Sequence, residues 1–199
     1  MTRQLQFSAI CLLLLAAIAL PQTAFAHAGH EPAGGFASGF FHPVLGWDHL
    51  VAMVAVGLWG AFLGAPAIWL LPVVFPLVMA LGAVLGIMGM PLPGVELGIA
   101  GSALVLGLLI LFAIRLPLGA AAIIVAAFAI FHGHAHGTEL PAAANPFAYG
   151  AGFVVATGLL HLAGIAFGLL VRWPVGVTAV RAGGGVVSLV GVAYLAGLA

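Results

Sequence analysis

Long apolar runs dominate the chain from Leu45 to its last residues, and proline, glycine and isolated charges separate one run from the next. Each run continues for about 20 residues, which is the length that a helix needs to cross the hydrocarbon core of a bilayer. Only 4% of the residues are charged and the mean hydropathy is +1.34, whereas the surface of a soluble domain carries far more charge. The sequence therefore predicts an all-α integral membrane protein.

The breaks between the apolar runs predict six transmembrane helices. We place these helices at about residues 45–64, 66–90, 94–115, 117–136, 145–171 and 174–198. The second helix contains Pro72 and Pro76 and is expected to kink, which a membrane helix tolerates where its neighbours satisfy the freed carbonyl groups. Gly-x-x-x-Gly pairs, such as Gly82 and Gly86, predict close crossings between helices.

The first 26 residues have the composition of a cleavable signal peptide. Arg3 supplies the positive start, residues 7–20 are apolar, and Ala24-Phe25-Ala26 forms a small-x-small cleavage site. A retained first helix is the alternative, but Pro21 interrupts the run before it reaches the length of a span. The predicted organisation is a signal peptide at 1–26, an exported His- and Gly-rich segment at 27–44, and a six-helix transmembrane domain at 45–199.

Cleavage after Ala26 would leave His27 as the new N-terminus, with His30 and Glu31 close behind it. A free amine beside an imidazole can chelate a divalent metal ion, and His30 and Glu31 could supply further ligands. An exported polar tail without such a role is an equal alternative. Residues 32–40 are rich in glycine and alanine and are predicted to form a short flexible or re-entrant lead-in to the first helix.

The arginines indicate how the helices run through the membrane. If the mature N-terminus is exported, the connections that hold Arg115 and Arg172 lie in the cytoplasm, as the positive-inside rule requires for a bacterial inner-membrane protein. The same count places most acidic and histidine side chains at the exported face: His42, Asp48, His49, Glu96, His132, His134, His136 and Glu139. Candidate metal ligands therefore gather on the side from which an imported substrate would arrive.

The first group of candidate ligands is His42, Asp48 and His49, at the start of the first predicted helix. If the helix already begins at Pro43, the two histidines are seven residues apart and share a face. A short break at Gly46 would instead let all three side chains converge. Taken singly, the histidines could be interfacial residues and the aspartate a helix-start residue. Together, imidazole and carboxylate suit first-row divalent ions, whereas Mg²⁺ and Ca²⁺ call for oxygen ligands alone.

The second group lies near the end of the fourth predicted helix, where His132, His134 and His136 alternate and Glu139 follows. On a helix, His132, His136 and Glu139 are spaced i, i+4 and i+7, so these three line one face. His134 points roughly 160° away and would serve a neighbouring helix or the N-terminal tail. A His-rich interfacial loop with no specific role is the alternative. The spacing favours a second set of metal ligands.

Two further residues carry ionisable groups inside or at the edge of the predicted bundle. His161 lies in the middle of the fifth helix, where an imidazole needs a partner or a water-filled cavity. It could be a second ion site, a proton acceptor, or a structural hydrogen-bond donor. Glu96 begins the third helix and either adds negative charge to the entrance or only starts the helix.

Three motifs together resemble the HupE/UreJ family of nickel permeases, which are hydrogenase and urease accessory proteins. They are His42-Pro43-x-x-Gly46-x-Asp48-His49, Phe131-His132-Gly133-His134-Ala135-His136-Gly137-x-Glu139, and Ala156-Thr157-x-x-Leu160-His161. The likeness spans the chain, and the two longer motifs are specific. The resemblance implies nickel uptake across the inner membrane for hydrogenase or urease maturation. It also implies that the following residues handle the ion: His42, Asp48, His49, His132, His134, His136 and Glu139.

Several function classes are excluded or disfavoured. The chain has no lysine and so no G-x4-G-K-[ST] loop, and its few charges exclude a nucleic-acid surface. The expected partners are a transported metal ion and the lipid bilayer, with no prosthetic group. An intramembrane hydrolase pairing Ser102 with His161, or a haem-binding electron carrier, would leave the clustered histidines unexplained. Three questions are left open. They are whether the transported ion is nickel, cobalt or another divalent metal, whether transport is channel-like or by alternating access, and whether the protein forms a homo-oligomer.

Overall fold

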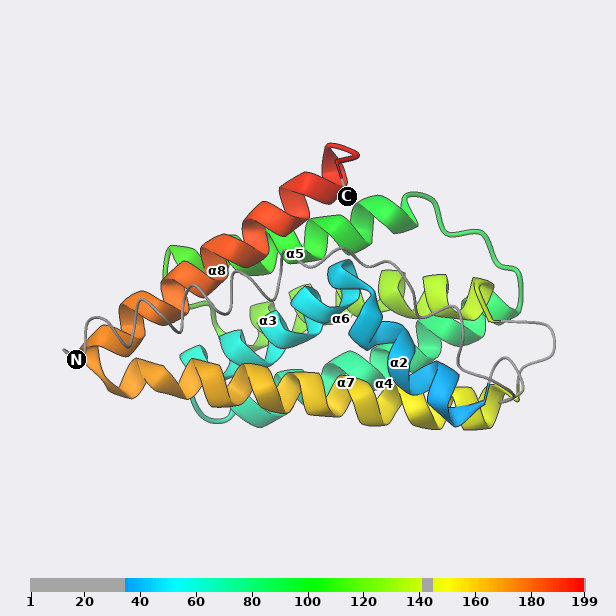
Figure 1. The fold of residues 1–199 in the computed structure, drawn as a ribbon, viewed down its shortest axis with the longest axis horizontal. Helices are drawn as coiled ribbons and strands as arrows, with labels where there is room; N and C mark the ends of the chain where they lie inside the picture. Colours follow the sequence, from blue (N-terminus) through cyan, green and yellow to red (C-terminus); the bar gives the residue numbers. More distant parts are fainter. Residues whose placement is uncertain (1–34, 141–144, 199) are drawn as a thin grey trace, which may run out of the picture. The chain divides into compact units, whose positions relative to one another are not determined.

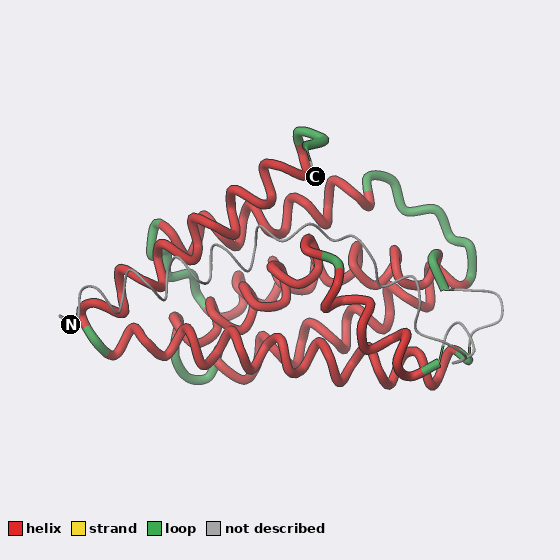
Figure 2. Tube along the Cα trace, viewed as in Figure 1, coloured by secondary structure: helices red, strands yellow, loops and turns green. Residues whose placement is uncertain are grey.

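The computed structural model describes residues 35–140 and 145–198, and the regular structure within these ranges is entirely helical (Figures 1 and 2). The elements are α2 (Phe36–Leu45), α3 (Trp47–Leu63), α4 (Ala67–Ile87), α5 (Val95–Leu111), α6 (Leu118–Thr138), α7 (Pro146–Gly168), the 3-10 helix η1 (Leu169–Arg172) and α8 (Pro174–Leu195). The predicted signal peptide, His27 and His30 lie outside the described residues. The predicted all-α fold is confirmed for the part of the chain that the structure describes.

Four of these helices are long and apolar enough to cross a membrane, namely α4, α6, α7 continued by η1, and α8. The pair α2 and α3 also qualifies when taken together, although the two helices are bent by 83° at the break between them. Counting this pair as one span raises the total to as many as five. Helix α5 is apolar but has only 17 residues. The chain is therefore a multi-pass membrane protein, and the count of six spans stays a prediction.

Residues 36–45 form helix α2, which precedes the predicted first helix, α3; for the described part of residues 32–40 the flexible lead-in is wrong, and the re-entrant one stays a prediction. Contact with α7 explains the difference. A Cβ atom on Gly39 would overlap the carbonyl oxygen of Tyr149, and one on Gly152 would overlap that of Phe36. The two backbones therefore touch, and α2 is held as a helix by a partner more than a hundred residues away, which no local pattern reveals.

The helices pack in pairs that are far apart in the sequence. The most extensive contacts join α4 to α6, α5 to α8, and α7 to both α2 and α3, and Figure 1 shows α8 lying along α5. Small residues line these crossings: Gly133 and Gly137 of α6 lie directly against the backbone of α4 at Met79 and Ala83. Large side chains such as Trp59 fill the space between the pairs. The close crossing predicted from Gly82 and Gly86 is present, because a Cβ atom on either glycine would overlap the backbone of α6.

Two arginines lie near helix ends remote from the histidines of the two motifs. Arg115 stacks on the ring of Phe62, in the last turn of α3, with the guanidinium carbon 4.9 Å from the ring centroid. Arg181 donates a hydrogen bond from Nε to the carbonyl oxygen of Leu111, at the end of α5. Arg115 thus lies at the opposite end of α3 from His49.

Candidate metal site

A sharp bend at Gly46 brings the first group of candidate ligands together. Gly46 separates α2 from α3, and its backbone is extended, with φ −82° and ψ 109°. As a result, the rings of His42 and His49 lie 6.0 Å apart at an interplanar angle of 86°. A continuous helix from Pro43, one of the two predicted arrangements, is wrong, and the convergence predicted for a break at Gly46 is confirmed.

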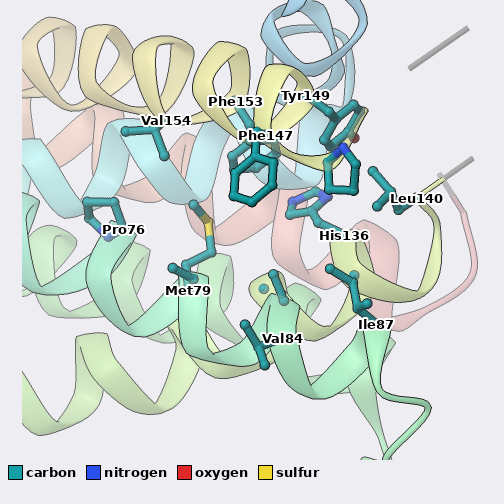
Figure 3. Close-up of a pocket in the computed structure, with 16 residues that line it drawn as sticks. Pro76, Met79, Val84, Ile87, His136, Leu140, Phe147, Tyr149, Phe153 and Val154 are labelled. Carbon is teal, nitrogen blue, oxygen red and sulfur yellow. The ribbon is translucent and has the colours of Figure 1, made fainter. Parts of the chain in front are cut away.

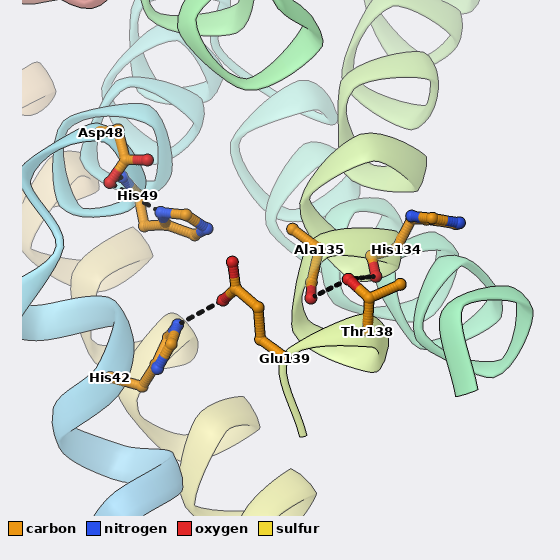
Figure 4. Close-up of polar contacts among 7 residues, drawn as sticks. All are labelled: His42, Asp48, His49, His134, Ala135, Thr138 and Glu139. Atoms are coloured by element: carbon orange, nitrogen blue, oxygen red, sulfur yellow. Dashed lines mark hydrogen bonds and ion pairs between the residues drawn. The ribbon is translucent and has the colours of Figure 1, made fainter. Parts of the chain in front are cut away.

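Asp48 orients the ring of His49. The Oδ1 atom of Asp48 lies 2.7 Å from Nδ1 of His49 and also accepts the backbone N–H of His49 at 2.9 Å (Figure 4). A carboxylate accepts but does not donate, so Nδ1 of His49 carries the proton in this contact. In the neutral ring, the free lone pair then resides on Nε2, the nitrogen available to a metal ion.

Helix α6 supplies the second pair of imidazoles to the same place. The ring of His49 lies 4.9 Å from that of His132 and 4.5 Å from that of His136. The ring of His42 lies 4.8 Å from that of His136. His132 and His136 are one turn apart on α6, so both reach the bend between α2 and α3. We call His42, His49, His132 and His136 the His cluster.

Glu139 adds a carboxylate at the edge of the His cluster. It follows the last residue of α6, and its Oε2 atom lies 3.6 Å from Nε2 of His42 (Figure 4). One ligand atom each from His42, His136 and Glu139 can be chosen so that all three lie within 4.8 Å of one another. The Glu139 side chain is 53% exposed, whereas His136 is buried, so the group leads from the surface to the interior.

Four buried nitrogens of the His cluster lack hydrogen-bond partners among the described residues. Nε2 of His49, Nδ1 of His132 and both ring nitrogens of His136 are fully buried and unpaired. Buried polar side-chain atoms are nearly always hydrogen-bonded, because an unpaired one costs about 1–3 kcal/mol. Neutral imidazole has one lone pair, so these three neighbouring rings offer three lone pairs, which suits them to a divalent transition ion.

His134 and Glu96 lie apart from this group. Nε2 of His134 is 2.7 Å from the carbonyl oxygen of Met90, beyond the end of α4. Figure 4 shows the His134 ring pointing away from His42 and His49, so the predicted divergence of His134 is confirmed. Glu96 is exposed in the first turn of α5 and forms no ion pair with the described residues. The structure does not bring either side chain to the His cluster.

His161 lies deeper in the bundle, and Phe75 connects it to the His cluster. The Phe75 ring is 5.5 Å from that of His132 and 5.5 Å from that of His161. Both nitrogens of His161 are buried without a hydrogen bond among the described residues. The carbonyl group of Pro72 lies close by, and it has lost its helical donor because Pro76 has no N–H. His161 and the Pro72 carbonyl group therefore form a second polar position, deeper in the bundle than the His cluster.

Two contacts of the His cluster with other side chains were not predicted from the sequence. Ser102 of α5 lies with Oγ 3.0 Å from Nε2 of His132, so the structure pairs it with His132 and not with His161, as the hydrolase alternative required. The Phe153 ring lies 4.1 Å from that of His136. Nothing in the local sequence marks either residue, because the contacts depend on how α5 and α7 cross α6.

A cavity of about 440 Å³ reaches His136 from between α4, α6 and α7 (Figure 3). Its walls are mainly apolar, with Met79, Leu140 and Phe153 among them. The His136 ring thus has apolar side chains on its cavity side and the imidazoles of the His cluster on its other side. Apolar walls around a ligand group exclude water and strengthen its interaction with a charged substrate.

Comparison with known proteins gives the same family as the three sequence motifs. The chain matches the family described as HupE / UreJ protein over residues 14–194. It is similar to Protein HupE of Rhizobium leguminosarum bv. viciae, with 48% identity over 183 residues that cover 92% of this chain and 95% of the relative. No solved structure matches. The chain therefore belongs to the HupE/UreJ family.

Proposed function

We propose that the protein is a secondary transporter that takes up a divalent transition metal ion across the bacterial inner membrane. Nickel is the proposed substrate. The observation that carries the proposal is the convergence of four imidazoles and the Glu139 carboxylate at the bend between α2 and α3. Membership of the HupE/UreJ family supports it, and by resemblance the imported ion would serve hydrogenase or urease maturation. The protein would catalyse no covalent reaction.

The donor set favours a borderline metal ion over a hard one. The available ligands are ring nitrogens of His42, His49, His132 and His136 with one carboxylate, whereas Mg²⁺ and Ca²⁺ prefer oxygen ligands throughout. In this scheme Asp48 acts through His49, because its carboxylate already holds Nδ1 of that ring. Cobalt is the alternative substrate, since affinity alone does not separate it sharply from nickel.

The proposed route begins at the exported face with Glu139 and the His cluster. From there the ion passes Phe75 and reaches His161, the second polar position, before it is released to the cytoplasm. An inside-negative potential supplies about 2.3 kcal/mol per charge per 100 mV, which is about 4.6 kcal/mol for a divalent ion. That free energy supports accumulation of roughly 10³-fold without ATP. Binding must stay moderate, because an ion that is held too tightly does not leave.

Flux measurements on the purified protein test this function. We expect proteoliposomes with an inside-negative potential to take up Ni²⁺ faster than protein-free vesicles and to discriminate it from Co²⁺ and Zn²⁺ offered at the same concentration. A higher flux of Co²⁺ than of Ni²⁺ would make cobalt the substrate. Equal flux of all three ions in vesicles with and without protein would contradict metal transport altogether.

Uptake is expected to fall as the external pH is lowered. Protonated imidazole has no lone pair for a metal ion, so ligation weakens once the rings of the His cluster take up protons. His49, His132 and His136 are buried beside one another, which disfavours the charged ring, so the fall in uptake is expected below the ordinary histidine range near about pH 6.5. The initial rate of Ni²⁺ uptake is measured from about pH 7.5 to about pH 4.5, with the membrane potential clamped by a potassium gradient and valinomycin. A rate that stays flat down to the lowest pH would argue against histidine ligation.

His161→Ala is expected to separate binding from transport. The Phe75 ring lies between this residue and His132, so equilibrium binding of Ni²⁺ at the entrance should be unchanged while the steady-state flux falls by about tenfold or more. Binding is measured by equilibrium dialysis and flux in proteoliposomes of the same preparation. A variant that transports at the rate of the wild type would leave His161 with only a structural role.

A further inference from the structure

We propose that Ser102 is a positioning residue that fixes the tautomer of His132, so that Nδ1 of this ring is the nitrogen that meets the transported ion. The inference rests on the proposed function and extends it to a residue of α5, a helix that contributes no ligand. Ser102 is completely buried, as is His132. The argument needs only the hydrogen bonds that the serine hydroxyl makes.

The Ser102 hydroxyl has one proton, and its two neighbours decide where that proton lies. Its Oγ atom is 2.6 Å from the carbonyl oxygen of Ile99, one turn earlier in α5. A carbonyl oxygen can only accept, so two oxygens at this distance attract each other only when the hydroxyl proton lies between them. The hydroxyl therefore donates to Ile99, as serines inside helices often do to the preceding turn.

His132 must then be the donor in its contact with Ser102. Nε2 of His132 lies 3.0 Å from Oγ, and the only proton of the hydroxyl is already engaged. The hydroxyl lone pairs remain free to accept, which assigns the proton of the neutral ring to Nε2. The lone pair of His132 consequently resides on Nδ1. That nitrogen is buried and has no partner among the described residues.

The assigned tautomer completes a pattern within the His cluster. Asp48 holds the proton of His49 on Nδ1 and leaves Nε2 free, whereas Ser102 holds the proton of His132 on Nε2 and leaves Nδ1 free. The centroids of the two rings are 4.9 Å apart, so two neighbouring imidazoles each keep one nitrogen that has no hydrogen-bond partner among the described residues. Hydrogen bonds to the far nitrogen of a ligating histidine fix ring orientation and raise metal affinity.

The test compares Ser102→Ala with a matched serine elsewhere. Ser188 of α8 is also buried and back-bonded, with Oγ donating to Gly184 at 3.1 Å, and its hydroxyl forms no hydrogen bond to a histidine among the described residues. We expect Ser102→Ala to weaken equilibrium binding of Ni²⁺ by about 10–100-fold, the usual loss when such an outer partner is removed. Ser188→Ala should bind as the wild type does. Ser102→Thr, which keeps a hydroxyl able to bond the preceding turn, should restore most of the affinity.

A spectroscopic measurement on the metal-free wild type tests the tautomer directly. In protein labelled with ¹⁵N-histidine, the two-bond ¹H–¹⁵N correlation pattern of His132, identified by its loss in His132→Asn, should be that of a ring protonated at Nε2. In Ser102→Ala the pattern should shift toward a mixture of tautomers. This readout does not depend on metal and needs no variant to bind or transport.

The outcomes separate this inference from the proposed function. A wild-type ring protonated at Nδ1, unchanged affinity in Ser102→Ala, or an equal loss in Ser188→Ala would each overturn the role of Ser102 while leaving metal binding by the wild type in place. A wild type that binds no divalent ion would overturn the proposed function, and the role of Ser102 in ligation with it.

Discussion

Replacing His49 by alanine is expected to abolish nickel uptake and to weaken equilibrium binding of Ni²⁺ by at least about 100-fold. His49 lies at the centre of the His cluster, where its ring is 4.5 Å from that of His136, 4.9 Å from that of His132 and 6.0 Å from that of His42. Its Nε2 atom is buried and free of hydrogen bonds among the described residues, so removing the ring deletes a free nitrogen from the middle of the His cluster. His136→Ala should behave in the same way.

His134→Gln is the matched control for this loss. His134 is buried on the same helix as His136, but its Nε2 atom lies 2.7 Å from the Met90 carbonyl oxygen, away from the His cluster. Glutamine offers an amide donor for that carbonyl group, so the variant should fold and bind Ni²⁺ with unchanged affinity. Binding is measured by isothermal titration calorimetry on protein checked by size-exclusion chromatography. Equal losses in His49→Ala and His134→Gln would place the ion elsewhere.

Gly133→Ala is expected to cost more than about 3 kcal/mol of folding free energy and to remove most of the folded protein from the membrane. A Cβ atom at residue 133 would overlap the carbonyl oxygen of Met79 and lies against the backbone nitrogen of Ala83. The obstacle is the α4 backbone and not a flexible side chain, so the two helices must move apart. Because His132 and His136 belong to α6, only folded protein holds them in the His cluster. Nickel binding should therefore fall in proportion to the fraction of protein that is folded.

Gly119→Ala controls for the same change in the same helix. Residue 119 lies in the first turn of α6, and a Cβ atom there would meet no other atom within 4 Å. Alanine is preferred over glycine in a helix by up to about 1 kcal/mol, so this variant should be neutral or slightly more stable. The measurement is the midpoint of thermal unfolding in detergent, followed by the fluorescence of the tryptophans. A midpoint for Gly133→Ala equal to that of the wild type would show that the crossing of α4 and α6 tolerates the methyl group.

Much of the candidate site could be predicted because periodicity within one helix depends only on sequence. The spacing of His132, His136 and Glu139 predicted a shared face, and it predicted that His134 points elsewhere; the structure has both features. The near absence of charge likewise determined an all-helical membrane protein, since apolar runs of this length have few alternatives in a bilayer.

The tertiary structure alone decided how the helices meet. The bend at Gly46, the helical state of residues 36–45 and the contact between Ser102 and His132 all depend on partners far along the chain. Gly39 and Gly152 show the physical reason: a missing Cβ atom permits two backbones to touch, but the sequence does not say which two. The sequence by itself therefore determined which side chains could bind a metal ion, and the helix crossings decided which of them lie together.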